Sequence, residues 1–347
     1  MAASPDPEDG PVTNREDDPP TRRGRLLRML RRPAGVRHSA PTVAAALLLL
    51  AACSQPSPPS PTTTHSPSHA DTPQGPYVAL GDSYTSGTDI PDQVGSPAGC
   101  DRSDRNYPTL LARHFKLAAG EVHDVSCSGA TIADLSASQN TSSGVNPAQL
   151  SVLTSSTRLV TLGIGGNDLD FSGVLTRCVE MDAPGTILDL LRNAQSGSTP
   201  CRSYYTDGGT DQIRQKIQTV QTGLAAALAR IHRLAPRARV FVVGYPDLLP
   251  ADGAAGCSNS LAITPGDVAY LDGEELQLNS MLRQQAAAAH DTFVDTYTPS
   301  LGHDACSAAS TRWIEPLLTR AAAPLHPNAF GQQGIADAVE RAVFGRS

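Results

Sequence analysis

The sequence is poor in lysine and in aromatic side chains. Only Lys116 and Lys216 occur among 347 residues, aromatic residues make up 4%, and the formal net charge is -7. Nucleic-acid-binding proteins usually carry a basic patch, so this charge balance predicts no nucleic-acid partner. The seven cysteines include no C-x-x-C pair, which argues against a structural zinc site. We therefore expect neither a metal nor another cofactor.

Long hydrophobic runs are also scarce. An unbroken apolar run of ten residues, 43–52, follows a basic patch at 29–37. Ten residues are too few to span a bilayer but suit the hydrophobic part of an export signal. Because such signals begin at once with their basic segment, we expect translation to start at Met29. The run ends in Leu50-Ala51-Ala52-Cys53.

This ending resembles a bacterial lipobox, in which the cysteine is lipidated and becomes the mature N-terminus. The alternative is a plain secretory signal in which Cys53 is incidental. Residues 1–53 are thus predicted to be an N-terminal extension with a lipoprotein-type signal peptide. In residues 54–75, 15 of 22 are Pro, Ser or Thr, so they are predicted to be a disordered tether. The protein would be extracellular, either secreted or anchored to the outer face of the membrane through Cys53.

Six cysteines remain when Cys53 is set aside, and an exported protein meets an oxidising environment. Sequence alone leaves 15 ways to pair them. Most of them lie in or beside three long predicted connections, at 84–105, 169–209 and 245–267. That placement favours sequential pairs: Cys100–Cys127, Cys178–Cys201 and Cys257–Cys306.

From residue 76 onward, short apolar segments alternate with amphipathic ones. The predicted strands are 77–80, 122–125, 158–162, 240–244 and 292–294, and the predicted helices are 106–117, 211–234, 268–290 and 328–343. This alternation is typical of a parallel sheet covered by helices on both faces. We expect residues 76–347 to form a single α/β domain, a three-layer α/β/α sandwich with a five-stranded, mostly parallel sheet.

Four short motifs lie beside the ends of predicted strands or before the last helix. They contain, in order along the chain, Ser83 in Gly-Asp-Ser-Tyr-Thr-Ser-Gly, Gly129 in Ser-Cys-Ser-Gly-Ala-Thr, Asn167 in Gly-Ile-Gly-Gly-Asn-Asp and His326 in Pro-Leu-His-Pro-Asn. Ligands of parallel α/β sheets bind at the carboxyl ends of the strands. The third motif does not match G-x-G-x-x-G and has no P-loop lysine, so a nucleotide site is not predicted.

Each motif has a structural interpretation beside the chemical one. Asp82 or Ser83 could cap a helix, Gly129 and Asn167 could be turn residues, and His326 could be an ordinary surface histidine. In the chemical interpretation, Ser83 is a nucleophile, His326 is a general base, and Gly129 and Asn167 donate hydrogen bonds to an oxyanion.

Taken together and in this order, the motifs resemble the SGNH (GDSL-like) hydrolase family. The four residues after which that family is named match Ser83, Gly129, Asn167 and His326. The resemblance covers about residues 77–343 and is strongest to secreted lipases and esterases of high-GC Gram-positive bacteria. It implies a flavodoxin-like SGNH hydrolase fold and six cysteines paired in sequence order. Tyr84 stands where the family consensus has leucine, as it does in that subgroup.

The resemblance also implies a mechanism. The Ser83 hydroxyl would attack an ester carbonyl while His326 removes its proton, and the N–H groups of Ser83 and Gly129 with the Asn167 amide would bind the oxyanion. Most family members have an aspartate three residues before the histidine, but this chain has Ala323. We expect the Ala323 carbonyl to orient the imidazole, with Glu315 and Asp304 as alternative carboxylates.

The predicted function is extracellular hydrolysis of carboxylic esters of lipids or small alcohols, through an acyl-enzyme at Ser83, by a monomer. One alternative is O-deacetylation of a polysaccharide on the same fold. Another, from a different class, is a catalytically inactive lipid-anchored binding protein. Asp168 and Asp170 lack further spaced ligands, so they do not predict a metal site.

Overall fold

A computed structural model of the protein describes residues 75–182, 199–250, 253, 257, 261–319 and 321–345. The predicted start at Met29, the signal peptide, Cys53 and all of the tether except Gly75 lie outside the described residues. In the part of the chain that is described, no helix is long and apolar enough to cross a bilayer.

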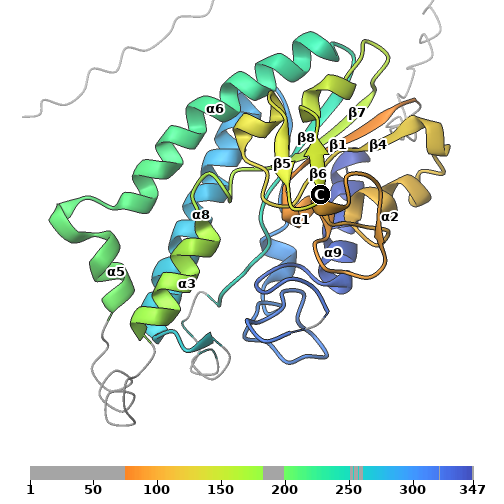
Figure 1. Ribbon diagram of the computed structural model, residues 1–347. Helices are drawn as coiled ribbons and strands as arrows, with labels where there is room; N and C mark the ends of the chain where they lie inside the picture. Colours follow the sequence, from red (N-terminus) through yellow and green to blue (C-terminus); the bar gives the residue numbers. More distant parts are fainter. Residues whose placement is uncertain are drawn as a thin grey trace, which may run out of the picture. The chain divides into compact units, whose positions relative to one another are not determined.

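The centre of the domain is a five-stranded sheet (Figure 1). Its strands are β1 (Tyr77–Gly81), β4 (Val122–Asp124), β7 (Leu159–Gly163), β8 (Arg239–Val243) and β9 (Thr292–Val294), in the order β4-β1-β7-β8-β9. Every neighbouring pair is parallel. This confirms the predicted α/β fold, with a sheet that is entirely rather than mostly parallel. Because the strand order reverses beside β1, a crevice opens at the carboxyl ends of β1 and β7.

Helices cover both faces of the sheet, as Figure 1 shows. They are α2 (Tyr107–His114) and α9 (Ala329–Val343) on one face, and α6 (Gln212–Leu234) and α8 (Pro265–Ala288) on the other. Successive side chains of each strand point to opposite faces of the sheet, so the core has two parts. Tyr77, Ala79 and Phe241 pack with α2 and α9, whereas Val78, Leu80 and Val242 pack with α6 and α8. Each strand is therefore buried on both sides, which explains its continuous apolar sequence.

Local sequence signals set where the long helices begin. Asn106, Asp211, Thr264 and Asn328 each accept a hydrogen bond from a backbone N–H of the first turn of α2, α6, α8 and α9, respectively. Such side chains replace hydrogen bonds that the first turn of a helix cannot make internally. The predicted strands and helices are confirmed, with boundaries that move by a few residues.

Two segments that were expected to be loops contain regular structure. Residues 169–209 include α3 (Phe171–Asp182) and α5 (Pro200–Tyr205), and residues 84–105 include most of α1 (Ser83–Ser86) and the hairpin β2–β3 (Gln93–Val94, Arg102–Ser103). The remaining short elements are the hairpin β5–β6 (Gln139–Thr141, Gly144–Asn146) and 3-10 turns at Ala98–Cys100, Ala119–Glu121, Ile132–Leu135, Gln149–Val152, Asp207–Gly209 and Thr298–Ser300. Apart from α3, these elements span too few residues for hydrophobic periodicity to identify them.

Three disulfides connect these peripheral segments. They are Cys100–Cys127, Cys178–Cys201 and Cys257–Cys306, which is the sequential pairing expected from their positions. The first joins the segment after α1 to the loop that follows β4. The second joins α3 to α5 across the longest predicted connection.

Candidate active site

Ser83 occupies the sharp turn between the first strand and a one-turn helix. β1 ends at Gly81, Asp82 caps α1 by accepting a hydrogen bond from the Tyr84 N–H (3.0 Å), and Ser83 is the first helical residue. The capping and the chemical interpretations of this motif are therefore compatible, because they concern different side chains. Asp82 is the cap, and its neighbour Ser83 faces a pocket.

The turn requires glycine at position 81. A Cβ atom there would lie 2.5 Å from the Gly163 carbonyl oxygen, so any side chain would push β1 away from β7. The Gly81 backbone is fixed further by Gln149, whose side-chain oxygen accepts from the Gly81 N–H (2.8 Å) and whose amide donates to the Gly81 carbonyl (2.9 Å). Sequence reasoning missed Gln149, which is fully buried and lies 68 residues away along the chain.

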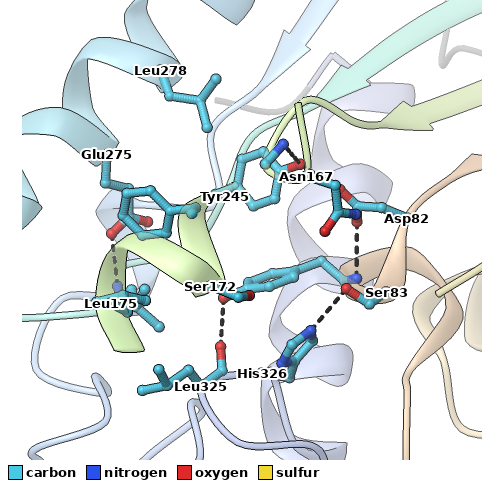
Figure 2. Close-up of a pocket in the computed structure, with 14 residues that line it drawn as sticks. Asp82, Ser83, Asn167, Ser172, Leu175, Tyr245, Glu275, Leu278, Leu325 and His326 are labelled. Carbon is cyan, nitrogen blue, oxygen red and sulfur yellow. Dashed lines mark hydrogen bonds between the residues drawn. The ribbon is translucent and has the colours of Figure 1, made fainter. Parts of the chain in front are cut away.

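His326 is brought to Ser83 from the opposite end of the chain. Its Nε2 lies 2.8 Å from the Ser83 Oγ, and its Nδ1 lies 2.7 Å from the Pro324 carbonyl oxygen (Figure 2). A carbonyl can only accept, so Nδ1 carries the proton. Nε2 is then the acceptor for the Ser83 hydroxyl, which is the orientation that a general base requires.

The carbonyl that contacts the imidazole is not the predicted one. The Ala323 carbonyl accepts the backbone N–H of His326 (3.2 Å) and so closes a turn over residues 323–326. Within that turn, Leu325 has φ 60°, a left-handed conformation that is unusual for a branched side chain. The turn commits the Ala323 carbonyl to the backbone and directs the Pro324 carbonyl to the ring.

Neither alternative carboxylate contacts the imidazole. Glu315 is buried and accepts hydrogen bonds from Arg312 (2.9 Å) and from the Asn328 side chain (2.8 Å). Its backbone pairs with the segment that presents His326 (residues 323–327, the histidine loop), donating to the His326 carbonyl and accepting from the Leu325 N–H. Asp304 accepts instead from the Cys306 N–H (2.7 Å). Glu315 thus supports the loop that presents His326 but does not contact its ring.

Hydrogen-bond donors are available beside the Ser83 hydroxyl. Among the described residues, neither the Ser83 N–H nor the Gly129 N–H has an acceptor. The Asn167 Nδ2 donates one hydrogen to the Ala130 carbonyl (2.9 Å), which holds the amide and leaves its second hydrogen available. Asp168 accepts from the Ile132 N–H (3.1 Å), so the loops after β4 and β7 are joined twice. The Asp168 carboxylate therefore serves to hold these two loops together.

Burial determines the charge state of the central groups. Desolvation lowers the pKa of His326 below its usual value, although the Pro324 carbonyl and Asp89 act in the opposite direction. The imidazole is therefore neutral near pH 7 and can accept a proton. Burial raises the pKa of Asp82 to about 7, against the opposing effect of the Tyr245 hydroxyl, which donates to it at 2.5 Å.

Two tyrosines that sequence reasoning did not assign to the site support it. The Tyr84 hydroxyl donates to the Leu325 carbonyl (2.6 Å), and its ring centroid lies 4.9 Å from that of His326 and 5.1 Å from that of Tyr245. The Tyr245 hydroxyl also accepts from the Gly166 N–H (2.8 Å). The position of Tyr245 directly after β8 was the available signal, because side chains at strand ends gather at this edge.

The pocket beside Ser83 is largely apolar (Figure 2). It is lined by Asp82, Ser83, Tyr84, Gly166, Asn167, Phe171, Ser172, Leu175, Tyr245, Leu248, Glu275, Leu278, Leu325 and His326. Its walls come from α3, α8 and the histidine loop, so α3, which the sequence did not reveal, forms part of the binding surface. The fold and this site define a carboxylic ester hydrolase.

Comparison with known proteins identifies the family. Residues 79–333 match the GDSL-like Lipase/Acylhydrolase family. The chain is 38% identical to Lipase 2 of Streptomyces coelicolor over 277 residues, which cover 79% of this chain and 88% of that protein. The chain belongs to the GDSL-like lipase/acylhydrolase family.

Two solved structures from Streptomyces have the same fold. Phospholipase A1 from Streptomyces albidoflavus NA297 is 28% identical, with a TM-score of 0.61, and the match covers 77% of this chain and 99% of that one. An extracellular lipase from Streptomyces rimosus is 29% identical, with a TM-score of 0.58, and the match covers 78% of this chain and 100% of that one.

Proposed function

We propose that the protein hydrolyses carboxylic esters of lipids outside the cell, with Ser83 as the nucleophile and His326 as the general base. The observation that carries this proposal is the 2.8 Å contact between the His326 Nε2 and the Ser83 Oγ, two residues that line an apolar pocket. Lipid substrates are supported by that apolar lining and by relatives described as lipases and a phospholipase A1. The three disulfides are typical of an exported protein.

The reaction follows from the positions of the groups. The Ser83 Oγ attacks the ester carbonyl carbon while its proton passes to the His326 Nε2. The carbonyl oxygen becomes an oxyanion, which the N–H groups of Ser83 and Gly129 and the Asn167 amide can bind. The tetrahedral intermediate collapses, the proton moves from the Nε2 to the leaving alcohol, and the acyl group stays on Ser83. Water, deprotonated by His326, then attacks the acyl-enzyme; the bond between the acyl carbon and the Ser83 Oγ breaks, His326 returns the proton to the Oγ, and the acid is released.

The orienting group for His326 in this scheme is the Pro324 carbonyl. It fixes the tautomer and the ring direction, as an aspartate would, but it carries a partial rather than a full negative charge. It therefore stabilises the imidazolium less than a carboxylate would. Export and anchoring through Cys53 complete the proposal: the tether would separate the enzyme from the membrane surface.

Ser83→Ala tests the assignment. We expect turnover of a p-nitrophenyl ester to fall by about 10⁴- to 10⁶-fold, as for removal of other serine nucleophiles. Labelling by a fluorophosphonate probe should disappear in the same variant. Ser172→Ala is the matched control, because Ser172 lines the same pocket but does not contact His326. Retained labelling in Ser83→Ala, or loss of labelling in Ser172→Ala, would contradict the proposal.

A further inference from the structure

The wall of the pocket opposite Ser83 contains a carboxyl group. Glu275, on α8, lines the pocket and is only 3% exposed. Figure 2 shows it across the pocket from Ser83 and His326, with the Tyr245 ring between the two ends. Sequence reasoning gave this residue no role, and the hydrolysis of a simple ester does not require it.

Only one of the two Glu275 oxygens has a protein partner. Its Oε2 accepts a hydrogen bond from the Leu248 N–H at 3.1 Å. Its Oε1 is buried and has no hydrogen-bond partner among the described residues. Buried polar atoms are nearly always satisfied, so this oxygen, on a residue that lines the pocket beside Ser83, is available to a polar group of a bound molecule.

The charge state of Glu275 broadens what this oxygen can bind. Burial raises the pKa of Glu275 well above its usual value, and nearby Asp247 and Asp272 raise it further. A protonated carboxyl group offers both a donor and an acceptor. A hydroxyl group also donates and accepts, so the two are complementary. A plain alkyl chain would leave the Oε1 unpaired and would keep water from reaching it.

The walls between the two ends determine which part of an ester reaches Glu275. Leu175, Leu248 and Leu278 line this part of the pocket and are all buried. They suit a hydrocarbon segment that runs toward Glu275. The alcohol leaves after acylation, whereas the acyl group stays attached to Ser83 until water releases it. An acyl chain that lies along these leucines therefore keeps its contacts through both steps of the reaction.

We propose that Glu275 is a specificity-determining residue that selects acyl chains with a hydroxyl group remote from the ester carbon. The proposal rests on the proposed hydrolysis at Ser83 and names the substrate class of that site. The selection depends on one hydrogen bond. A hydroxylated acyl chain of the right length binds the Glu275 Oε1 through its hydroxyl, whereas a chain without the hydroxyl leaves the Oε1 unpaired. Discrimination by such buried polar groups is strong because the wrong substrate leaves them unsatisfied.

The test compares p-nitrophenyl n-alkanoates with their ω-hydroxy analogues over a series of increasing acyl-chain length. The measured quantity is the ratio of kcat/KM for the hydroxy ester to that for the plain ester at each length, after subtracting the enzyme-free rate. In the unmodified protein we expect this ratio to peak at one length. In Glu275→Leu the peak should fall by about tenfold, the usual effect of losing one buried hydrogen bond. Glu275→Gln should keep much of it.

Glu274→Gln is the matched control. Glu274 is the next residue, is equally buried and contacts Arg214 (2.9 Å) rather than the pocket. This variant should leave the ratio unchanged, and fluorophosphonate labelling of Ser83 reports correct folding in every variant. A ratio that does not vary with chain length, or one that is identical in Glu275→Leu and the unmodified protein, would overturn the role of Glu275. Hydrolysis that survives Ser83→Ala would instead overturn the proposed function itself.

Discussion

His326 is oriented by a neutral main-chain group. The Pro324 carbonyl accepts from the Nδ1, and the Tyr84 ring packs against the imidazole. A carboxylate at this position would raise the pKa of the histidine by favouring its charged form. Here only the Pro324 carbonyl dipole and the charge of Asp89 raise the pKa of His326. The effect of burial is larger, so the pKa of His326 is lowered. His326 is therefore neutral and able to accept a proton at neutral pH, but the imidazolium that forms during catalysis is stabilised less.

The pH dependence of kcat/KM should reflect this lowered pKa. Catalysis requires neutral His326, so activity is lost only as the pH falls through the depressed pKa. We expect kcat/KM to stay level from neutral pH to below about 6.5, the ordinary histidine value, and then to fall. An acidic limb centred above pH 7 in a stopped-assay profile would contradict this.

An inflection near pH 7 in the profile of kcat/KM would come from Asp82, whose pKa is raised to about 7, and not from His326. Asp82→Asn separates the two groups, because asparagine keeps the helix cap but does not titrate. The inflection would disappear in that variant, whereas the limb due to His326 would remain.

Tyr84 stands where the family consensus has leucine, and its hydroxyl holds the histidine loop through the Leu325 carbonyl. Tyr84→Phe removes that hydrogen bond and keeps the ring. We expect kcat to fall by about 3- to 10-fold, the worth of one such bond, with little change in KM. Tyr84→Leu, which also removes the ring contacts with His326 and Tyr245, should lose more. Equal kcat values in the Phe variant and the unmodified protein would show that the loop does not need this support.

At the scale of elements, the long strands and helices were predictable because their signals are local and repeated. Strands such as β1 and β7 are continuous apolar segments buried on both faces, and helices such as α6 repeat their apolar positions over many turns. Their order also predicted that Ser83, Asn167 and His326 meet at one edge. α3 was missed although its twelve residues make it longer than α2, which has eight and was predicted. It lies with α5 and α6 between the neighbouring strands β7 and β8, so the alternation of strands with helices does not require it.

The histidine loop was predicted only in part, for a physical reason. The sequence shows that Ala323 replaces an aspartate, but which carbonyl faces the ring depends on the turn. That turn is set by Leu325 at positive φ and by backbone pairing with Glu315. The pairing is a tertiary effect, since Glu315 lies outside the histidine loop and meets it only in the folded chain. Glu275 and Tyr245 were missed in the same way, because their roles depend on which side chains face one pocket.

Glu315 should matter for the stability of this loop and much less for the chemistry. Glu315→Ala removes the partner of Arg312 and of Asn328, which caps α9. We expect it to lower the free energy of unfolding by about 2–3 kcal/mol, as for loss of buried hydrogen bonds to a charged group. Thermal melting and turnover per fluorophosphonate-labelled site are the two measurements.

Turnover per labelled site should stay within about tenfold of the unmodified enzyme, far from the roughly 10⁴-fold loss seen when an orienting aspartate is altered. Asp304→Ala should behave in the same way. A loss of several orders of magnitude in either variant, without a change in melting temperature, would identify that carboxylate as the orienting acid. It would also rule out the carbonyl as the sole orienting group.

At the scale of the whole domain, α3 and α5 are held to α8 by a cluster of buried groups. The Cys178–Cys201 disulfide joins α3 to α5. Asp267, in the first turn of α8, accepts from the Cys201 N–H (3.0 Å), and Asp182, at the end of α3, accepts from the Thr264 N–H (2.7 Å). Burial raises the pKa of Asp182 to about 7, and the proximity of Asp267 raises it further. The cluster therefore needs a proton to be stable, and α3 carries part of the substrate pocket.

This proton links the stability of the domain to pH. An unfolded aspartate has a pKa of about 3.9, so between about pH 4 and 7 the folded protein binds more protons than the unfolded one. The contribution of Asp182 to stability then decreases as the pH rises through this window and levels off above it. Asp182→Asn keeps an acceptor for the Thr264 N–H and does not titrate. Melting temperatures of the variant and the unmodified protein should therefore diverge from pH 5 to pH 8, in favour of the variant.

Asp337→Asn is the matched control for this effect, because Asp337 is exposed and its contact with Gln333 survives the change. Its melting curve should run parallel to that of the unmodified protein at every pH. Asp82, which also has a raised pKa, will still contribute a decrease with pH in both proteins, so the difference between the curves is the quantity that isolates Asp182. If the Asp182→Asn curve also runs parallel, Asp182 is ionised in the folded protein, and the junction of α3, α5 and α8 does not depend on a bound proton.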